Sequence, residues 1–180
     1  MLISNSSTAP RPQRISVTVN ASYPDLKVEK ANVRYARMIE ADMASIRGEM
    51  TALCQYLYQS WAVETIHPEL SDIFLRISEV EMHHLNILGR LAVMLGGSPK
   101  LSNMTMSGSF PWNGCMVNYS KDLKTILVQN TALEQEAVKT YLGQAAQVED
   151  RYLSAMLTRI AQDEQLHRDI FQNFQERLAE

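Results

Sequence analysis

Hydrophobic positions recur at helical spacing through most of this chain. Between about residues 28 and 63, Ile46, Leu53, Tyr56 and Leu57 lie three, four or seven positions apart, as one face of an α-helix requires. The segments that follow are rich in Ala, Leu, Glu, Gln and Met, which favour helices. The pattern predicts four helices, over about residues 28–63, 68–95, 120–147 and 150–178.

Residues that start or stop helices set the expected boundaries. Pro68 suits the first turn of the second predicted helix, and the Gly-Gly-Ser-Pro run at residues 96–99 ends it. Ser120 is a candidate N-cap for the third helix. The break between the third and fourth helices contains neither Gly nor Pro, so the sequence places it only to within several residues.

A long connection, about residues 96–119, separates the second and third predicted helices. It contains a turn-forming Pro-Trp-Asn-Gly sequence at residues 111–114, whereas the other connections are short. We therefore expect helices one and two to form one hairpin, helices three and four another, and the long crossover to join them. The predicted fold class is all-α, with residues 28–180 forming a four-helix bundle.

Residues 1–27 precede the first predicted helix and are rich in Ser, Thr, Pro and Asn. Residues 15–19 have the composition of a strand, but the chain offers them no partner strand. We expect this segment to be an N-terminal arm that lies on the bundle or on a neighbouring molecule.

Composition and charge exclude several classes of protein. A formal net charge of −3 leaves no basic footprint for nucleic acid. No window approaches the roughly 18 apolar residues that a membrane span needs. The first residues lack the apolar core of a signal peptide, so we expect a cytoplasmic protein. Cys54 and Cys115 form no C-x-x-C pair, which excludes a thiolate metal site of that type.

Two Glu-x-x-His motifs, at residues 81–84 and 164–167, carry the expected chemistry. Residues three apart lie side by side on a helix, so the Glu and His of each motif can reach one ion together. Glu49 in the first predicted helix and Glu134 in the third add one carboxylate each. This is the ligand pattern of the di-iron and di-manganese carboxylate bundles.

The ligand candidates lie on apolar helix faces, where Glu81, for example, is in line with Phe74, Ile77 and Leu88. A carboxylate there is costly without a partner, and four converging carboxylates would repel one another unless cations lay between them. Carboxylate and imidazole ligands suit iron and manganese. We therefore predict two metal ions, Fe or Mn, and no catalytic side chain separate from their ligands. The predicted ligands are Glu49, Glu81, His84, Glu134, Glu164 and His167.

The two halves of the chain repeat these features. Tyr56 follows Glu49 at the same spacing at which Tyr141 follows Glu134. Both tyrosines are candidates for hydrogen bonds to a ligand side chain, with core packing as the alternative. Glu136 competes with Glu134 as a ligand, and the match to Glu49 and Tyr56 favours Glu134.

Three nearby groups stay outside the predicted ligand set. His83 and His67 are expected at the surface. Asp163 precedes a ligand candidate directly, and it either supports a ligand or is merely exposed.

These residues resemble the ferritin-like superfamily, and within it the rubrerythrin and manganese-catalase branch, above all the short bacterial proteins near the spore-coat manganese catalases. The resemblance covers about residues 28–178. It implies a ferritin-like bundle with one long crossover. The chain departs from rubrerythrins in lacking a rubredoxin-type domain, from ferritins in lacking a fifth short helix, and from better-known catalases in being shorter. The segments that carry the resemblance are residues 48–58, 81–84, 111–119, 134–141 and 163–167.

The resemblance implies a dinuclear non-haem oxidoreductase acting on hydrogen peroxide, of the catalase or peroxidase type. The alternatives are an iron-binding or storage protein and a metal-stabilised structural bundle, of a coat type, without turnover. Expected partners are hydrogen peroxide or dioxygen, an external electron donor for peroxide reduction, and further copies of the chain in a homo-oligomer. In the expected arrangement one carboxylate bridges the two ions, with Glu81 and Glu164 as the candidates, and each histidine caps one ion. Glu49 and Glu134 bind terminally.

Overall fold

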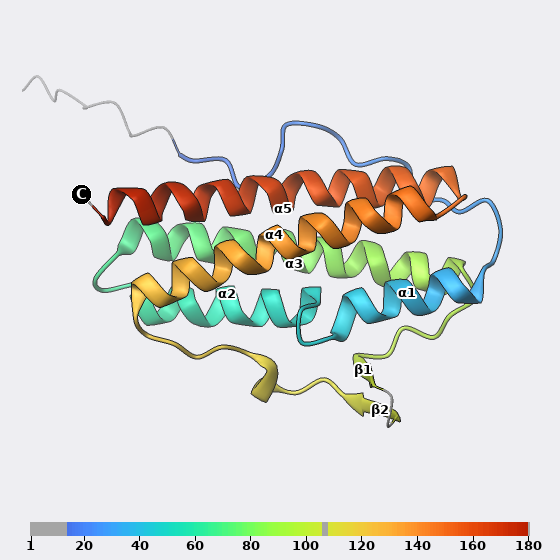
Figure 1. Ribbon diagram of the computed structural model, residues 1–180, viewed down its shortest axis with the longest axis horizontal. Helices are drawn as coiled ribbons and strands as arrows, with labels where there is room; N and C mark the ends of the chain where they lie inside the picture. Colours follow the sequence, from blue (N-terminus) through green and yellow to red (C-terminus); the bar gives the residue numbers. More distant parts are fainter. Residues whose placement is uncertain (1–13, 106–107, 180) are drawn as a thin grey trace, which may run out of the picture.

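Five α-helices and a small β-hairpin make up the part of the chain that the computed structural model describes, residues 14–105 and 108–179 (Figure 1). The strands β1 (Ser102–Thr105) and β2 (Gly108–Pro111) pair antiparallel, and a short 3₁₀ helix, η1 (Gly114–Met116), follows them. The helices are α1 (Val33–Ala44), α2 (Glu49–Val63), α3 (Pro68–Met94), α4 (Leu123–Gln147) and α5 (Arg151–Arg177).

Two helix pairs form the bundle. α2 packs on α3 and α4 packs on α5, while α1 extends the α2 side of the bundle and also packs on α3 (Figure 1). The connection between α3 and α4 carries the β-hairpin and η1 across from one pair to the other. The prediction of an all-α, ferritin-like four-helix bundle with one long crossover is thereby confirmed. No described helix combines the length and the apolar character that crossing a membrane requires.

The prediction of one continuous helix over residues 28–63 is wrong. The chain leaves the helical conformation after Ala44 and resumes it at Glu49, with extended backbone at Ser45 and Gly48. A Cβ atom at Gly48 would lie 2.3 Å from the carbonyl oxygen of Asp42, so only glycine fits this close turn without a shift of the backbone. The spacing of Ile46 from Leu53 matches a helical face by coincidence, so the hydrophobic pattern does not reveal the break.

Two further details of the first predicted helix differ from the prediction. Ile46 lies between α1 and α2 and is 57% exposed, so it does not belong to the apolar face. The helix also starts later than residue 28, because the Asn32 side chain accepts hydrogen bonds from the N–H groups of Arg34 and Tyr35 and so caps α1.

Two aspartates cap the helices of the second pair. Asp122, rather than the expected Ser120, accepts a hydrogen bond from the N–H of Thr125 and caps α4. Asp150 caps α5 through the N–H groups of Tyr152 and Leu153. Side-chain oxygens of this kind satisfy backbone donors that a helix start leaves without partners. The sequence could not rank Ser120 and Asp122, since both are good capping residues.

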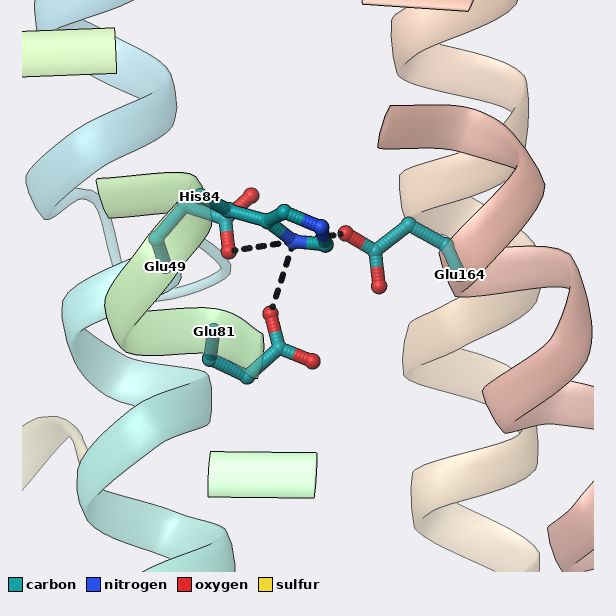
Figure 2. Close-up of side chains that lie close together, drawn as sticks. All are labelled: Glu49, Glu81, His84 and Glu164. Carbon is teal, nitrogen blue, oxygen red and sulfur yellow. Dashed lines mark ion pairs between the residues drawn. The ribbon is translucent and has the colours of Figure 1, made fainter. Parts of the chain in front are cut away.

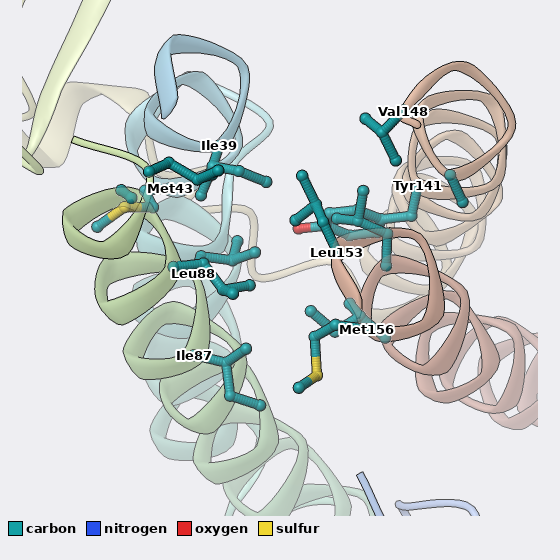
Figure 3. Packing of buried hydrophobic residues seen from close by; sticks show 14 of the residues in the cluster. Ile39, Met43, Ile87, Leu88, Tyr141, Val148, Leu153 and Met156 are labelled. Carbon is teal, nitrogen blue, oxygen red and sulfur yellow. The ribbon is translucent and has the colours of Figure 1, made fainter. Parts of the chain in front are cut away.

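The apolar core has two parts. One lies where α1, α3, α4 and α5 meet and includes Ile39, Leu88, Leu153 and Leu157 (Figure 3). The other lies where α2, α3, α4 and α5 meet, and it is built from residues including Phe74, Ile77, Ile126, Leu127 and Phe171. On α3, α4 and α5 alike, the glutamate of the predicted ligand set falls between the residues of the two parts. The fold therefore surrounds a charged cluster with apolar packing on both sides.

The described residues of the N-terminal segment run along the bundle beside α5 without forming a strand (Figure 1). Val17 of this segment is buried and belongs to the second part of the core. Arg14 forms an ion pair with Asp72 on α3. Residues 1–13 of the expected arm lie outside the described part of the chain. We call residues 14–27 the arm below.

Candidate metal centre

The six predicted ligand side chains converge in the middle of the bundle. α2 supplies Glu49, α4 supplies Glu134, and α3 and α5 supply the two Glu-x-x-His pairs. All six residues are at most 4% exposed. The helical period places each Glu and His of a pair on one inward face, and the antiparallel packing of four helices brings the faces to one level.

The six residues form two overlapping groups of ligand atoms. Within each group the ligand atoms lie within 4.8 Å of one another. One group contains Glu49, Glu81, His84 and Glu164 (Figure 2). The other contains Glu81, Glu134, Glu164 and His167. Because both groups share Glu81 and Glu164, the geometry offers two adjacent positions with two carboxylates between them.

Each histidine faces glutamates from both helix pairs. His84 Nδ1 lies 3.1 Å from Glu164 Oε1 and 3.5 Å from Glu81 Oε2. His167 Nδ1 lies 3.1 Å from Glu81 Oε1 and 3.3 Å from Glu164 Oε2. Glu49 Oε2 is 3.6 Å from His84 Nδ1. The Nδ1 atoms of both imidazoles therefore face the shared carboxylates, and the two ring centres lie 6.5 Å apart.

The residues fit two divalent cations. Four buried atoms that face the centre make no hydrogen bond within the described residues: Glu49 Oε2, Glu81 Oε1, His84 Nδ1 and His167 Nδ1. Buried polar atoms without a partner are costly, and cations placed among them would satisfy all four. The donors are carboxylate oxygens and imidazole nitrogens, a set that suits manganese and iron. Cys54 and Cys115 are free and outside both groups.

The electrostatics of the ligand side chains lead to the same view. Burial raises the pKa of Glu49 and Glu134, and the charges of Glu164 and Glu81 raise it further. Burial also opposes the charge on Glu81, but the close imidazoles of His167 and His84 outweigh it and lower the pKa.

The histidines show the converse behaviour. Burial lowers the pKa of His84 and of His167, yet the surrounding carboxylates outweigh it and hold both pKa values well above the ordinary range. The two imidazoles thus tend to keep their protons, and bound metal ions would replace this positive charge.

The two predicted tyrosines each contact a ligand candidate of the other helix pair. The Tyr56 hydroxyl donates to Glu134 and the Tyr141 hydroxyl donates to Glu49. Burial, and then the charge of the glutamate that each one contacts, raise the pKa values of both tyrosines. They therefore stay protonated and act as donors. Core packing was the alternative, and both are in fact buried as well.

The structure separates Glu134 from Glu136. Glu134 is 3% exposed and belongs to the cluster. Glu136 points outward, where it forms an ion pair with Arg47. His83 is exposed, as expected, while His67 is half-buried at the start of α3.

The structure decides between the two alternatives for Asp163, which is not exposed, and adds groups behind His84 that the sequence did not predict. Asp163 is fully buried. Its Oδ2 accepts a hydrogen bond from the Tyr23 hydroxyl of the arm at 2.5 Å and forms an ion pair with Arg159 at 2.7 Å. Burial raises the pKa of Tyr23 to about 12. Arg159 and Asp163 lie four apart, which is a readable sequence signal for a helical ion pair. Nothing in the sequence marks Tyr23.

A cavity of about 250 Å³ leads from the surface to the cluster. At its inner end it is lined by the four glutamates of the ligand set, and at its outer end by Ile46 and by the Arg47–Glu136 ion pair. It lies between α2 and α4, beside the break that follows α1. The break thus supplies the residues at the mouth of a route into the centre.

Comparisons with known proteins agree with this geometry. The rubrerythrin family model matches residues 43–175. A probable manganese catalase of Clostridium acetobutylicum is 28% identical in an alignment of 164 positions that covers 81% of this chain and 72% of that protein. Two crystal structures of KatB, a manganese catalase from Anabaena, share the fold with a TM-score of 0.76 and 22% identity. They cover 91% and 89% of this chain, and 81% and 80% of the KatB chain.

Proposed function

The chain belongs to the rubrerythrin family, and from that premise we propose that it disproportionates hydrogen peroxide at a centre of two manganese or iron ions. The observation that carries the proposal is the pair of overlapping ligand groups that share Glu81 and Glu164. The names of the relatives support this reaction, because one is called a probable manganese catalase and the other a manganese catalase. The narrow cavity suits a substrate as small as peroxide.

Each side chain has a definite part in this proposal. Glu81 and Glu164 would bind both ions, His84 and His167 one ion each, and Glu49 and Glu134 one ion each at the cavity side. When bound, the two ions would supply the redox change, so that one peroxide is reduced to water and another is oxidised to dioxygen. The protein supplies fixed ligands and apolar surroundings.

Glu49 lies at the inner end of the cavity, where an entering peroxide would meet the centre. It lines the cavity, and its Oε2 makes no hydrogen bond. Its other oxygen is held by the Tyr141 hydroxyl. Glu134 is held in the same way by Tyr56 and lines the same cavity.

The test is metal analysis of the purified protein together with oxygen release from added peroxide. About two manganese or iron ions per chain and rapid oxygen release are expected. Two metal ions without oxygen release would contradict disproportionation. Particle size would then decide between a peroxide reductase and an iron store, because a store needs a large closed shell. Less than one ion per chain after reconstitution would contradict the dinuclear centre itself.

A matched pair of variants makes this test specific. Glu81→Gln removes a carboxylate shared by both ligand groups, and it should abolish oxygen release and lower the metal content. Glu79→Gln changes an exposed glutamate on the same helix and should leave both unchanged. Equal activity in the two variants would contradict the role of the cluster.

A further inference from the structure

The two histidines of the centre, which lie on different helices, both contact the N-terminal arm. His84 Nε2 lies 3.1 Å from the Tyr23 hydroxyl. His167 Nε2 lies 2.8 Å from the main-chain carbonyl oxygen of Val17. The Nδ1 atom of each ring faces the glutamates and makes no hydrogen bond. One short segment therefore covers the outer nitrogen of both rings.

These contacts fix which nitrogen of each neutral ring carries the proton. A carbonyl oxygen can only accept, so His167 Nε2 must donate to Val17 and its Nδ1 is left with a lone pair. The Tyr23 hydroxyl gives its single proton to Asp163 Oδ2, 2.5 Å away. It can then only accept from His84 Nε2, which leaves the Nδ1 lone pair of His84 facing the centre as well.

The arm is held at this place by α5. Asp163 Oδ1 accepts hydrogen bonds from the N–H of Val19 at 2.8 Å and from the Thr18 hydroxyl at 3.1 Å. The Arg159 guanidinium donates to the carbonyl oxygens of Val19 and Ala21, each at about 3.1 Å. It also lies 4.2 Å from the centre of the Tyr23 ring. Asp163 directly precedes Glu164, so the arm docks beside a proposed ligand.

We propose that docking of residues 17–23 of the arm and binding of the two metal ions are thermodynamically coupled. The docked arm holds both imidazoles in the tautomer and orientation that present Nδ1 to the centre. An ion bound by Nδ1 strengthens the donor character of Nε2, and so tightens the arm in return, because coupling between two binding events is reciprocal. Tyr23 and Val17 are positioning residues and touch no ion. The inference rests on the dinuclear centre proposed above.

Tyr23→Phe tests the coupling from the side of the metal. The variant keeps the ring over Arg159 and removes the nearer of two acceptors for the His84 Nε2 proton, since Asp163 Oδ2 also lies 3.3 Å from this nitrogen. We expect its dissociation constant for Mn²⁺ to rise by roughly 10- to 100-fold, as is usual for partners of metal-binding histidines. Tyr35→Phe is the matched control, because its hydroxyl accepts only the Glu149 N–H, at 3.1 Å, and contacts neither histidine. Its affinity for Mn²⁺ should equal that of the wild type.

Amide hydrogen exchange tests the coupling from the side of the arm. Loading wild-type protein with Mn²⁺ should slow exchange of the Val19 amide, and Tyr23→Phe should reduce that slowing. If Tyr23 had only a structural role, Tyr23→Phe would change the rate of amide hydrogen exchange in the arm by the same factor with and without Mn²⁺.

The outcomes separate the inference from the proposed function. Wild-type metal affinity in Tyr23→Phe, with arm exchange insensitive to Mn²⁺, would overturn the coupling alone. Failure of the wild-type protein to bind Mn²⁺ or Fe²⁺ would overturn both the coupling and the proposed centre.

Discussion

The Tyr141 hydroxyl on α4 donates a hydrogen bond to Glu49 on α2, across the boundary between the two helix pairs. The reciprocal contact, from Tyr56 on α2 to Glu134 on α4, gives the centre an approximate two-fold symmetry. Each half of the chain thus holds one glutamate of the predicted ligand set from the other half. These two hydrogen bonds link the two helix pairs at the level of the metal centre.

Tyr141→Phe should weaken the centre without unfolding the protein. The ring can still pack in the core, but Glu49 loses the hydrogen bond from Tyr141 to its Oε1 and is less well oriented. We expect roughly 10- to 100-fold loss in metal affinity or in oxygen release. Tyr58→Phe is the control, because the Tyr58 hydroxyl contacts the carbonyl of Tyr119 instead of a carboxylate. Equal effects of both changes would argue that Tyr141 acts by packing alone.

Glu134→Gln and Glu136→Gln should differ in metal content. Glu134 is buried in the cluster, whereas Glu136 pairs with Arg47 at the mouth of the cavity. We expect elemental analysis to give about one ion per chain for Glu134→Gln and about two for Glu136→Gln. The opposite result would place the ligand at Glu136 and require α4 to turn in the loaded protein.

Metal binding should release protons and weaken as the pH falls. His84 and His167 have pKa values well above the ordinary range in the metal-free fold, so the metal must displace protons that the rings still hold near neutral pH. We expect the affinity for Mn²⁺ to fall about tenfold per pH unit for each proton displaced. Calorimetry in two buffers of different ionisation enthalpy counts those protons. A binding enthalpy that is independent of the buffer would contradict this expectation.

Asp42 should make the metal-free fold less stable as the pH rises. Burial raises the pKa of Asp42 to about 7, against a hydrogen bond from Gln144 that lowers it, while the ordinary value is 3.8. The fold therefore favours the protonated carboxyl. That contribution to stability is complete below about pH 4 and is lost as the pH rises through about 7.

Asp42→Asn isolates this contribution, since Asn keeps the oxygen that accepts from Gln144 and cannot ionise. The metal-free variant should be more stable than the wild type at about pH 8 and similar to it near pH 4. Chemical denaturation at several pH values gives the difference in unfolding free energy. A difference that stays constant with pH would show that Asp42 titrates normally.

Gly48→Ala and Gly143→Ala should have opposite effects on stability. A Cβ at Gly48 would collide with the backbone of α1, and we expect a cost of about 1–3 kcal/mol. A Cβ at Gly143, in the interior of α4, meets nothing within 4 Å and should stabilise the helix by about 0.5–1 kcal/mol. Thermal unfolding of the two variants checks both signs. A stable Gly48→Ala protein would mean that the break after α1 adjusts freely.

The helices, the crossover and the convergence of six side chains could be predicted from the sequence because they follow from local regularities. A helix repeats every 3.6 residues, so the Glu-x-x-His spacing fixes which side chains share a face, whatever surrounds them. Glu134 could be preferred over Glu136 for the same reason, through its match to Glu49 and Tyr56.

Three features could be known only from the tertiary structure. They are the break before Gly48, the hydrogen bonds of Tyr56 and Tyr141 to glutamates of the other helix pair, and the docking of the arm. Each depends on atoms that lie far apart along the chain or on the backbone itself. Tyr23 meets Asp163 across 140 positions, and Val17 meets His167 across 150 through a carbonyl group that every residue possesses. Such contacts leave no periodic pattern in the sequence, because the packing of the whole bundle determines them.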